Sequence, residues 1–207
     1  MIGSFHNSST ALRAYAKAFD YNAYNVANIN TPAFKPVSTT FSSLSHQGGV
    51  KLNPVRTESG AGYLIHTGNN LDFAIKGKGY FKVTEADGSV SHTRAGNFSK
   101  DGSGNLVTAK GGKVASHAVV DEKFEVSKNG EIYSDGAYKG RIDVVDKEGN
   151  LIPADQFSLE QGFLEASSVD LAREIIDGMV DLNSYKANMT SLQTADTLLG
   201  TIIDMTA

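Results

Sequence analysis

Apolar side chains recur at a seven-residue spacing near the start of the chain. Phe5, Leu12, Phe19 and Val26 form one such row between residues 4 and 28. A repeat of seven is typical of a helix with a narrow apolar seam. The pattern therefore predicts an N-terminal helix within residues 1–30.

The sequence after this row explains why the predicted helix ends there. Pro32 disfavours the α conformation at Thr31. Asn28 and Asn30 tolerate left-handed and turn conformations. We expect the chain to leave the helix at these residues and to turn outward.

A longer repeat fills residues 164–207. Steps of four and three alternate at Leu171, Ile175, Gly178, Leu182, Tyr185, Met189, Leu192, Asp196, Leu199 and Ile203. This is the a and d pattern of a coiled coil, interrupted by the missing side chain of Gly178 and the charge of Asp196. Ser167 and Asp170 have the spacing of a capping box, so we expect the helix to begin there. At about 1.5 Å per residue it would be roughly 50 Å long.

The middle of the chain follows a different pattern. Short runs of alternating apolar and polar residues are separated by Gly-containing turns such as Asp87-Gly88 and Asn129-Gly130, which are hairpin signals. Residues 67–163 are therefore expected to form an antiparallel β domain, and residues 31–66, with few periodic apolar positions, an extended connector. The predicted fold class is α+β, with long terminal helices that pack on each other as a coiled coil and a central antiparallel β domain that is held away from them.

Composition removes several classes of function. The 207 residues carry a formal net charge of −4 with no basic tract, so nucleic-acid binding is not expected. No cysteine is present, which removes disulfides and thiol chemistry. Neither a Sec signal nor a transmembrane helix is expected from the sequence.

The residue types that carry catalysis or bind metals are not grouped in a known pattern. The five histidines, at positions 6, 46, 66, 92 and 117, include no pair four residues apart. The DGSGN stretch at 101–105 begins like a calcium loop but has Leu106 and Gly112 where such a loop needs Gly and Glu. We predict no catalytic residue, metal, cofactor or small-molecule substrate.

A heptad row is often part of the core of its own chain. Here the C-terminal stripe is too long for the first helix to cover alone, and the predicted strands have one another as partners. A helix with an uncovered apolar stripe is marginal in water. The pattern therefore favours self-assembly through the two helical ends.

Three stretches occur in a fixed order along the chain. They are YNVANINTPAFK at 24–35, TGNNLDFAIKGKGYFKV at 67–83 followed by HTRAGNFSKDGSGNLVT at 92–108, and the segment 164–205 with its YKAN and QTAD elements. Together they resemble the bacterial flagellar axial proteins, the rod and hook subunits of the basal body. Ala33 departs from the family pattern, which usually has Gly there, so a positive φ is less expected at this residue.

The resemblance implies a structural, non-enzymatic subunit that polymerises helically with copies of itself and with other flagellar axial proteins. It also implies delivery by the flagellar export apparatus without a Sec signal, and a location in the periplasmic rod of the basal body. The short β region favours a rod subunit over a hook-type subunit. A coiled-coil surface protein with a β head, and a glycan-binding or hydrolytic β domain, are the alternatives from other classes.

Two groups of residues follow from this resemblance. The assembly seam, which would be buried when subunits meet, consists of Leu12, Phe19, Val26, Leu171, Ile175, Leu182, Tyr185, Met189, Leu192 and Leu199. The junction motif, which would join the helices to the β domain, consists of Asn25, Asn28, Asn30, Thr31, Pro32 and Phe34.

Overall fold

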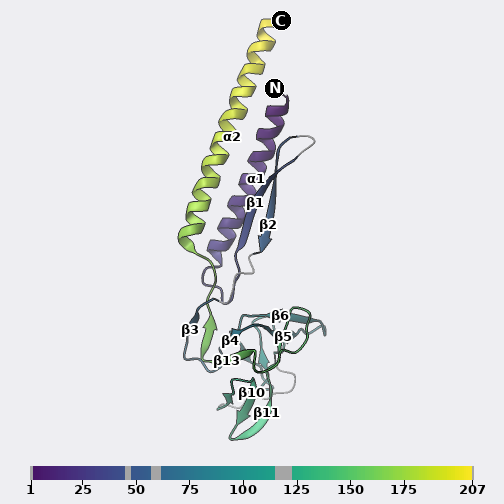
Figure 1. Cartoon of the computed structure of the whole chain (residues 1–207), viewed down its shortest axis with the longest axis vertical. Helices are drawn as coiled ribbons and strands as arrows, with labels where there is room; N and C mark the ends of the chain where they lie inside the picture. The colour runs from purple at the N-terminus through teal and green to yellow at the C-terminus, as the bar shows by residue number, and fades with distance from the viewer. Residues whose placement is uncertain (1, 45–47, 57–61, 115–122, 207) are drawn as a thin grey trace. The chain divides into compact units, whose positions relative to one another are not determined.

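The structure, a computed structural model, describes residues 2–44, 48–56, 62–114 and 123–206 (Figure 1). The two helices are α1 (Ile2–Ala27) and α2 (Leu171–Thr206). The strands are β1 (Val37–Ser43), β2 (Val50–Arg56), β3 (Leu64–His66), β4 (Phe73–Gly77), β5 (Tyr80–Thr84), β6 (Val90–Thr93), β7 (Ser99–Lys100), β8 (Leu106–Val107), β9 (Glu125–Val126), β10 (Glu131–Ser134), β11 (Ala137–Arg141), β12 (Val144–Val145), β13 (Phe157–Gln161) and β14 (Phe163–Glu165).

The chain forms two compact units, and the α+β prediction of two terminal helices and a β-rich middle is confirmed. The helical unit contains residues 1–29, 35–59 and 169–207, and the β unit contains residues 30–34 and 60–168. Every ladder between the described strands is antiparallel.

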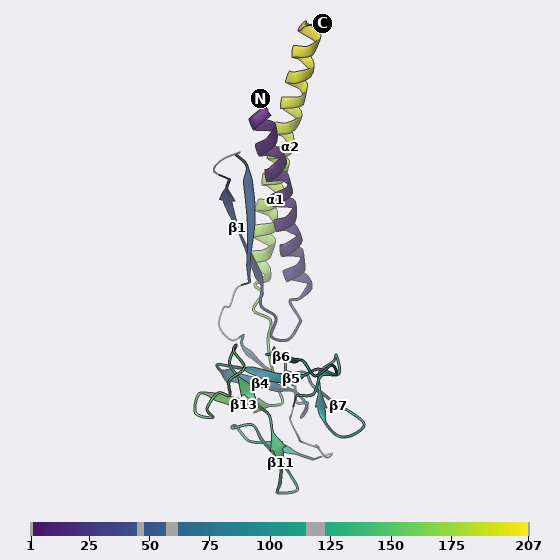
Figure 2. The ribbon, with the colours of Figure 1, turned by 90° about the vertical axis from the view of Figure 1, so that its right-hand side faces the viewer.

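Two antiparallel helices and one hairpin make up the helical unit (Figures 1 and 2). The hairpin is formed by β1 and β2 and lies within the segment expected to be an extended connector. Its register pairs Phe41 with Leu52, so both side chains share one face. The Phe41 ring lies 4.7 Å from the ring of Tyr15 on α1. On the opposite face, Asn53 donates a 2.9 Å hydrogen bond to Ser42. The hairpin therefore packs an apolar face on α1 and turns a hydroxyl-rich face outward.

Helix α2 begins later than the capping-box spacing predicts. Asp170 is the N-cap, because its carboxylate accepts a hydrogen bond from the Arg173 amide at 3.2 Å and its carbonyl accepts one from the Glu174 amide at 3.0 Å. Ser167 is buried and belongs to the β unit. The prediction that the helix begins at Ser167 is therefore wrong.

The β unit has a conventional apolar core. Its fully buried side chains come from β4, β5, β8, β10 and β12 and from the loops between them. They include Phe73, Ile75, Phe81, Val83, Leu106, Ile132, Ile142 and Val144. The Phe81 ring meets the Phe98 ring edge to face at 5.1 Å. This core is complete within the unit.

Aspartates set the tight turns of the β unit. Asp101 accepts hydrogen bonds from the amides of Ser103 and Asn105 and from the Asn105 side chain, each at 2.8 Å. Asp146 is held in the same way by Asn150. The hydrogen bonds from Asn105 and Asn150 lower the pKa of the two carboxyl groups. The DGSGN stretch is thus a hairpin turn whose carboxylate already binds its own loop.

Gly96 lies where no other residue fits. A Cβ at this position would be 1.7 Å from the carbonyl oxygen of Phe73, which is backbone at the start of β4. We expect Gly96→Ala to lower the free energy of unfolding by about 3 kcal/mol in denaturant titrations. Gly102→Ala is the matched control, because its Cβ meets no atom within 4 Å. Equal stability of the two variants would contradict this packing.

Candidate assembly interface

Helices α1 and α2 contact each other through small and polar residues. The buried line on α1, which α2 and the β1–β2 hairpin cover together, consists of Ala11, Ala14, Ala18, Asn22 and Asn25. The facing line on α2 includes buried Gly178 and Asp181 and partly buried Glu174, Tyr185, Asn188 and Leu192. Alanines bury little apolar surface compared with leucines or phenylalanines. The contact therefore covers only part of the apolar surface of the two helices.

Two amides hold two carboxylates across this contact. Asn22 donates to Asp181 at 3.0 Å and Asn25 donates to Glu174 at 3.0 Å. Burial raises the pKa of both carboxyl groups, and the Asp177 carboxylate adds to the rise, whereas the amide hydrogen bonds oppose it. Both pairs are charge–amide pairs, so burial of their charge opposes the helix contact at neutral pH.

Asn25 connects three elements. Its Nδ2 donates to the Val37 carbonyl at 3.0 Å and to Glu174, and its Oδ1 accepts from the Val37 amide at 2.9 Å. The side chain thus pairs with Val37 as a neighbouring strand would, and it is only 1% exposed. Asn25 fixes the start of β1 against both helices.

The assembly seam divides into three sets in the structure. The hydrogen bonds of Asn22 and Asn25 fix the antiparallel register, which places Leu12 opposite Met189, Phe19 opposite Leu182 and Val26 opposite Ile175. Tyr185 and Leu192 instead belong to the line that faces α1. Leu171 and Leu199 lie toward the two ends of α2.

The six residues of the first set lie on one side of the helix pair. Each of them comes one position after a residue of the line through which its helix contacts the other helix, on α1 and on α2 alike. Because the helices are antiparallel, the same offset places both rows on the same side. Phe19 confirms this placement, since its ring lies 3.9 Å from a Cβ built on Gly178. The exposed fraction of Phe19 is 48% and that of Leu182 is 43%.

The junction motif forms the exit from α1 and a tight turn. The Asn28 side chain donates to the Tyr24 carbonyl at 2.8 Å in the last turn of α1. The Phe34 amide then donates to the Thr31 carbonyl at 3.2 Å. Pro32 and a positive φ of 56° at Ala33 give this turn the features of type II. The expectation against a positive φ at Ala33 is therefore wrong, since the turn requires one.

A buried ion pair anchors this turn within the β unit. The Ala33 amide donates to the Glu165 carbonyl at 2.8 Å. The Glu165 carboxylate, 1% exposed, accepts from Arg94 Nε at 2.6 Å and from the Gly62 amide at 3.0 Å. Arg94 also donates to the carbonyls of Ile75, Gly77 and Gly79. No local pattern in the sequence indicates this pair, although Arg94 lies within the HTRAGNF stretch at 92–98.

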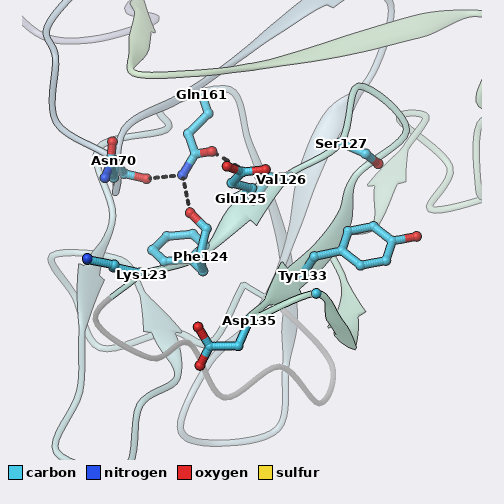
Figure 3. Close-up of a pocket in the computed structure, with 10 residues that line it drawn as sticks. Asn70, Lys123, Phe124, Glu125, Val126, Ser127, Tyr133, Asp135 and Gln161 are labelled. Carbon is cyan, nitrogen blue, oxygen red and sulfur yellow. Dashed lines mark hydrogen bonds between the residues drawn. The ribbon is translucent and has the colours of Figure 1, made fainter.

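A pocket in the β unit lies beside β9 and β10 (Figure 3). Its central amide, Gln161, donates to the carbonyls of Asn70 and Phe124 and accepts from the Val126 amide at 3.1 Å. These bonds connect backbone segments of the unit. The pocket is therefore best explained as part of the scaffold.

The described residues contain no group of three or more His, Asp or Glu side chains that could hold a metal ion. His46 and His117 lie outside these residues. In the described part of the chain, neither helix has the length and apolarity needed to cross a membrane.

Two protein-family models match the chain. The model described as the flagellar hook protein FlgE/F/G D1 domain matches residues 74–138. The model described as the flagellar basal body rod FlgEFG protein C-terminal matches residues 160–205. The first match lies within the β unit and the second includes nearly all of α2.

Rod proteins match over almost their whole length. The flagellar basal-body rod protein FlgG of Agrobacterium fabrum is 28% identical, over 91% of this chain and 94% of the relative. The FlgG protein of Bacillus subtilis is 25% identical, over 99% of each. The flagellar hook protein FlgE of Salmonella typhimurium is 34% identical, but over 52% of this chain and 28% of the hook protein.

The raised pKa values of Asp181 and Glu174 predict that the helix pair becomes more stable as the pH falls. Carboxyl groups whose pKa is higher in the folded state stabilise it when protonated, and this contribution is lost as the pH rises through the folded-state pKa. We expect the helices, followed by circular dichroism, to unfold at a higher temperature near pH 5 than at pH 7.

Asp181→Asn should raise the melting temperature at pH 7 and weaken this pH dependence. Asp196→Asn, an exposed change on the same helix, should do neither. The pKa values of Asp101 and Asp146 in the β unit are lowered, so these groups oppose the effect in the whole chain. The pH dependence of the melting temperature of each variant is therefore compared with that of the parent chain. An unchanged pH profile in Asp181→Asn would contradict this assignment.

The left-handed conformation of Ala33 predicts that Ala33→Gly stabilises the β unit. Glycine relieves about 1–2 kcal/mol of steric strain at this residue. It also gives the unfolded chain more conformational freedom, which lowers stability by about 0.4–1 kcal/mol. We expect a gain of about 0.5–1 kcal/mol in denaturant titrations. Ala95→Gly, at a residue without a positive φ, should lose stability instead.

Proposed function

Because the chain belongs to the family of flagellar basal-body rod and hook proteins, we propose that it is a structural subunit of the rod. Its terminal helices pack against those of other subunits in the manner of a coiled coil and so build a hollow helical shaft. The β unit, which has its own core, is the part that does not depend on this packing.

The observation that carries the proposal is the distribution of apolar side chains around α2. Ile175 and Leu182 are 47% and 43% exposed on the side shared with α1. Ile176 and Val180 are 60% and 57% exposed on another face. A helix with apolar residues on all sides is usually buried. One partner helix does not bury α2, so it needs the helices of neighbouring subunits.

The energy available from such burial is large. Each seam side chain contributes roughly 1.5–3 kcal/mol when it is fully buried. The free chain gains little of this, because its own helix contact consists mainly of alanines and amide–carboxylate pairs. The helical unit is therefore expected to gain most of its stability when subunits meet.

The comparisons favour a rod subunit over a hook subunit. Rod relatives are covered over 94% and 99% of their length, whereas the Salmonella hook protein is covered over 28%. The relatives described above are axial proteins of the flagellum, which also favours this function over a coiled-coil surface protein or a hydrolytic β domain.

Further parts of the proposal follow from family membership. The subunit acts without enzymatic activity, and its partners are copies of itself and other flagellar axial proteins. It reaches its place through the flagellar export apparatus without a Sec signal. The assembled subunit belongs to the periplasmic part of the basal body.

Complementation of a deletion strain tests the function. We expect cells without the chain to lack complete rods and to be non-motile in soft agar. Leu182→Asp should fail to restore swimming, because it places a charge on the seam while the β unit stays folded. Leu151→Asp is the control in the β unit, at an apolar residue that is 62% exposed against 43% for Leu182, and should restore it. Normal swimming of the deletion strain would refute the rod function.

A further inference from the structure

One face of the sheet β11–β10–β9 carries aromatic and charged side chains. Buried and partly buried residues alternate along β10, which places Glu131 and Tyr133 on the side away from the core. Tyr133 pairs with Tyr138 on β11 and with Glu125 on β9, and directly opposite residues share a face of the sheet. Three strands thus bring their side chains together. We call this surface the tyrosine face.

A β-bulge adds Arg141 to the tyrosine face. Tyr138 and Arg141 are three residues apart on β11, a spacing that places side chains of a regular strand on opposite faces. The register between β10 and β11 shifts at Lys139, which has no directly opposite residue. Arg141 is therefore opposite Glu131, on the same face as Tyr138. Bulges that reorient a side chain in this way are frequent beside functional sites.

The groups of the tyrosine face are only partly engaged with one another. The ring centroids of Tyr133 and Tyr138 are 6.0 Å apart in an edge-to-face arrangement, and Tyr138 is 61% exposed. The Tyr133 hydroxyl donates to the Glu131 carboxylate at 2.9 Å. The Nε of Arg141 is buried and has no hydrogen-bond partner among the described residues. Such a donor costs free energy, which is recovered when the guanidinium turns to an acceptor on a bound molecule.

We propose that the tyrosine face binds a neutral oligosaccharide. The guanidinium of Arg141 needs an acceptor, whereas the carboxylates of Glu125 and Glu131 accept only from donors. A sugar hydroxyl is both a donor and an acceptor. The C–H groups on one side of a pyranose ring form a flat apolar surface, and the exposed ring of Tyr138 offers the matching surface.

The charges of the tyrosine face favour a neutral ligand over an ion. Glu125 and Glu131 would repel a phosphate or carboxylate group bound at Arg141, and Arg141 would repel a cation bound at the two carboxylates. A neutral ring with hydroxyl groups meets neither repulsion. The inference goes beyond the proposed rod function and does not depend on it, because the β unit carries this face by itself.

The tyrosine face adjoins the pocket beside β9 and β10, because Tyr133 lines both (Figure 3). The side of the pocket at Gln161 holds backbone segments together. Ser127 and Asp135 also line the pocket and supply polar groups. A chain of several sugar rings can therefore extend from the tyrosine face toward these residues.

Saturation-transfer NMR on the full chain tests the proposal, with tetra-N-acetylchitotetraose and cellotetraose as the probes. Irradiation of protein signals transfers saturation only to a ligand that binds. We expect transfer to the ring C–H protons of at least one probe, with a dissociation constant of about 1 mM. The amide signals of residues 131–141, which span β10 and β11, should shift on addition of that probe. Absence of transfer to both probes, or shifts confined to other residues, would overturn the proposal.

Exchange of the exposed tyrosine tests the stacking. Tyr138→Ala should weaken binding about tenfold, because it removes the ring on which the sugar packs. Tyr138→Phe keeps the ring and should bind like the parent chain. Tyr63→Ala is the matched control, since Tyr63 is 73% exposed elsewhere in the β unit, and it should leave binding unchanged. Equal binding by Tyr138→Ala and the parent chain would contradict the site.

Arg141 distinguishes a sugar site from an anion site. Arg141→Gln should weaken binding of the oligosaccharide severalfold, and inorganic phosphate should not displace the oligosaccharide from the parent chain. If phosphate shifts the amide signals of residues 131–141 and neither oligosaccharide does, the surface is an anion site and the proposal is wrong. Thermal unfolding of each variant establishes the temperature at which it is folded and compared.

Discussion

The contact between α1 and α2 is the constraint on which the rest of the helical unit depends. Together with the β1–β2 hairpin it buries three alanines, two asparagines and an aspartate. Many large apolar side chains of both helices stay exposed. An alanine line allows two helices to approach closely but contributes little hydrophobic free energy. The contact therefore sets the arrangement of the two helices, whereas it buries few large apolar side chains.

Asn22 and Asn25 decide how the helices align. Each donates to one carboxylate of α2, and together they fix an antiparallel register. That register brings the two heptad rows side by side instead of face to face. A rotation of α2 about its axis by one residue, about 100°, would move Leu182 off the side that it shares with Phe19. Two polar contacts thus determine where the apolar surface lies.

The β unit is stabilised differently. Its core of phenylalanine, valine, isoleucine and leucine is closed within the unit, and its turns are held by aspartates. Glu165 and Arg94 join the turn at Ala33 to the first strands of this unit through one buried ion pair. A buried charge is tolerated there because each partner makes further hydrogen bonds to the backbone. The β unit is therefore held together by contacts among its own residues.

The sequence by itself determined the two terminal helices, the antiparallel strands between them and the apolar rows, because periodicity and turn residues are local signals. It did not reveal the β1–β2 hairpin, whose apolar alternation is weak, or the Arg94–Glu165 pair, whose members are 71 residues apart. The left-handed turn at Ala33 also came only from the structure, since alanine disfavours it. The tertiary structure decided which rows face each other, because the register depends on contacts between residues about 150 positions apart along the chain.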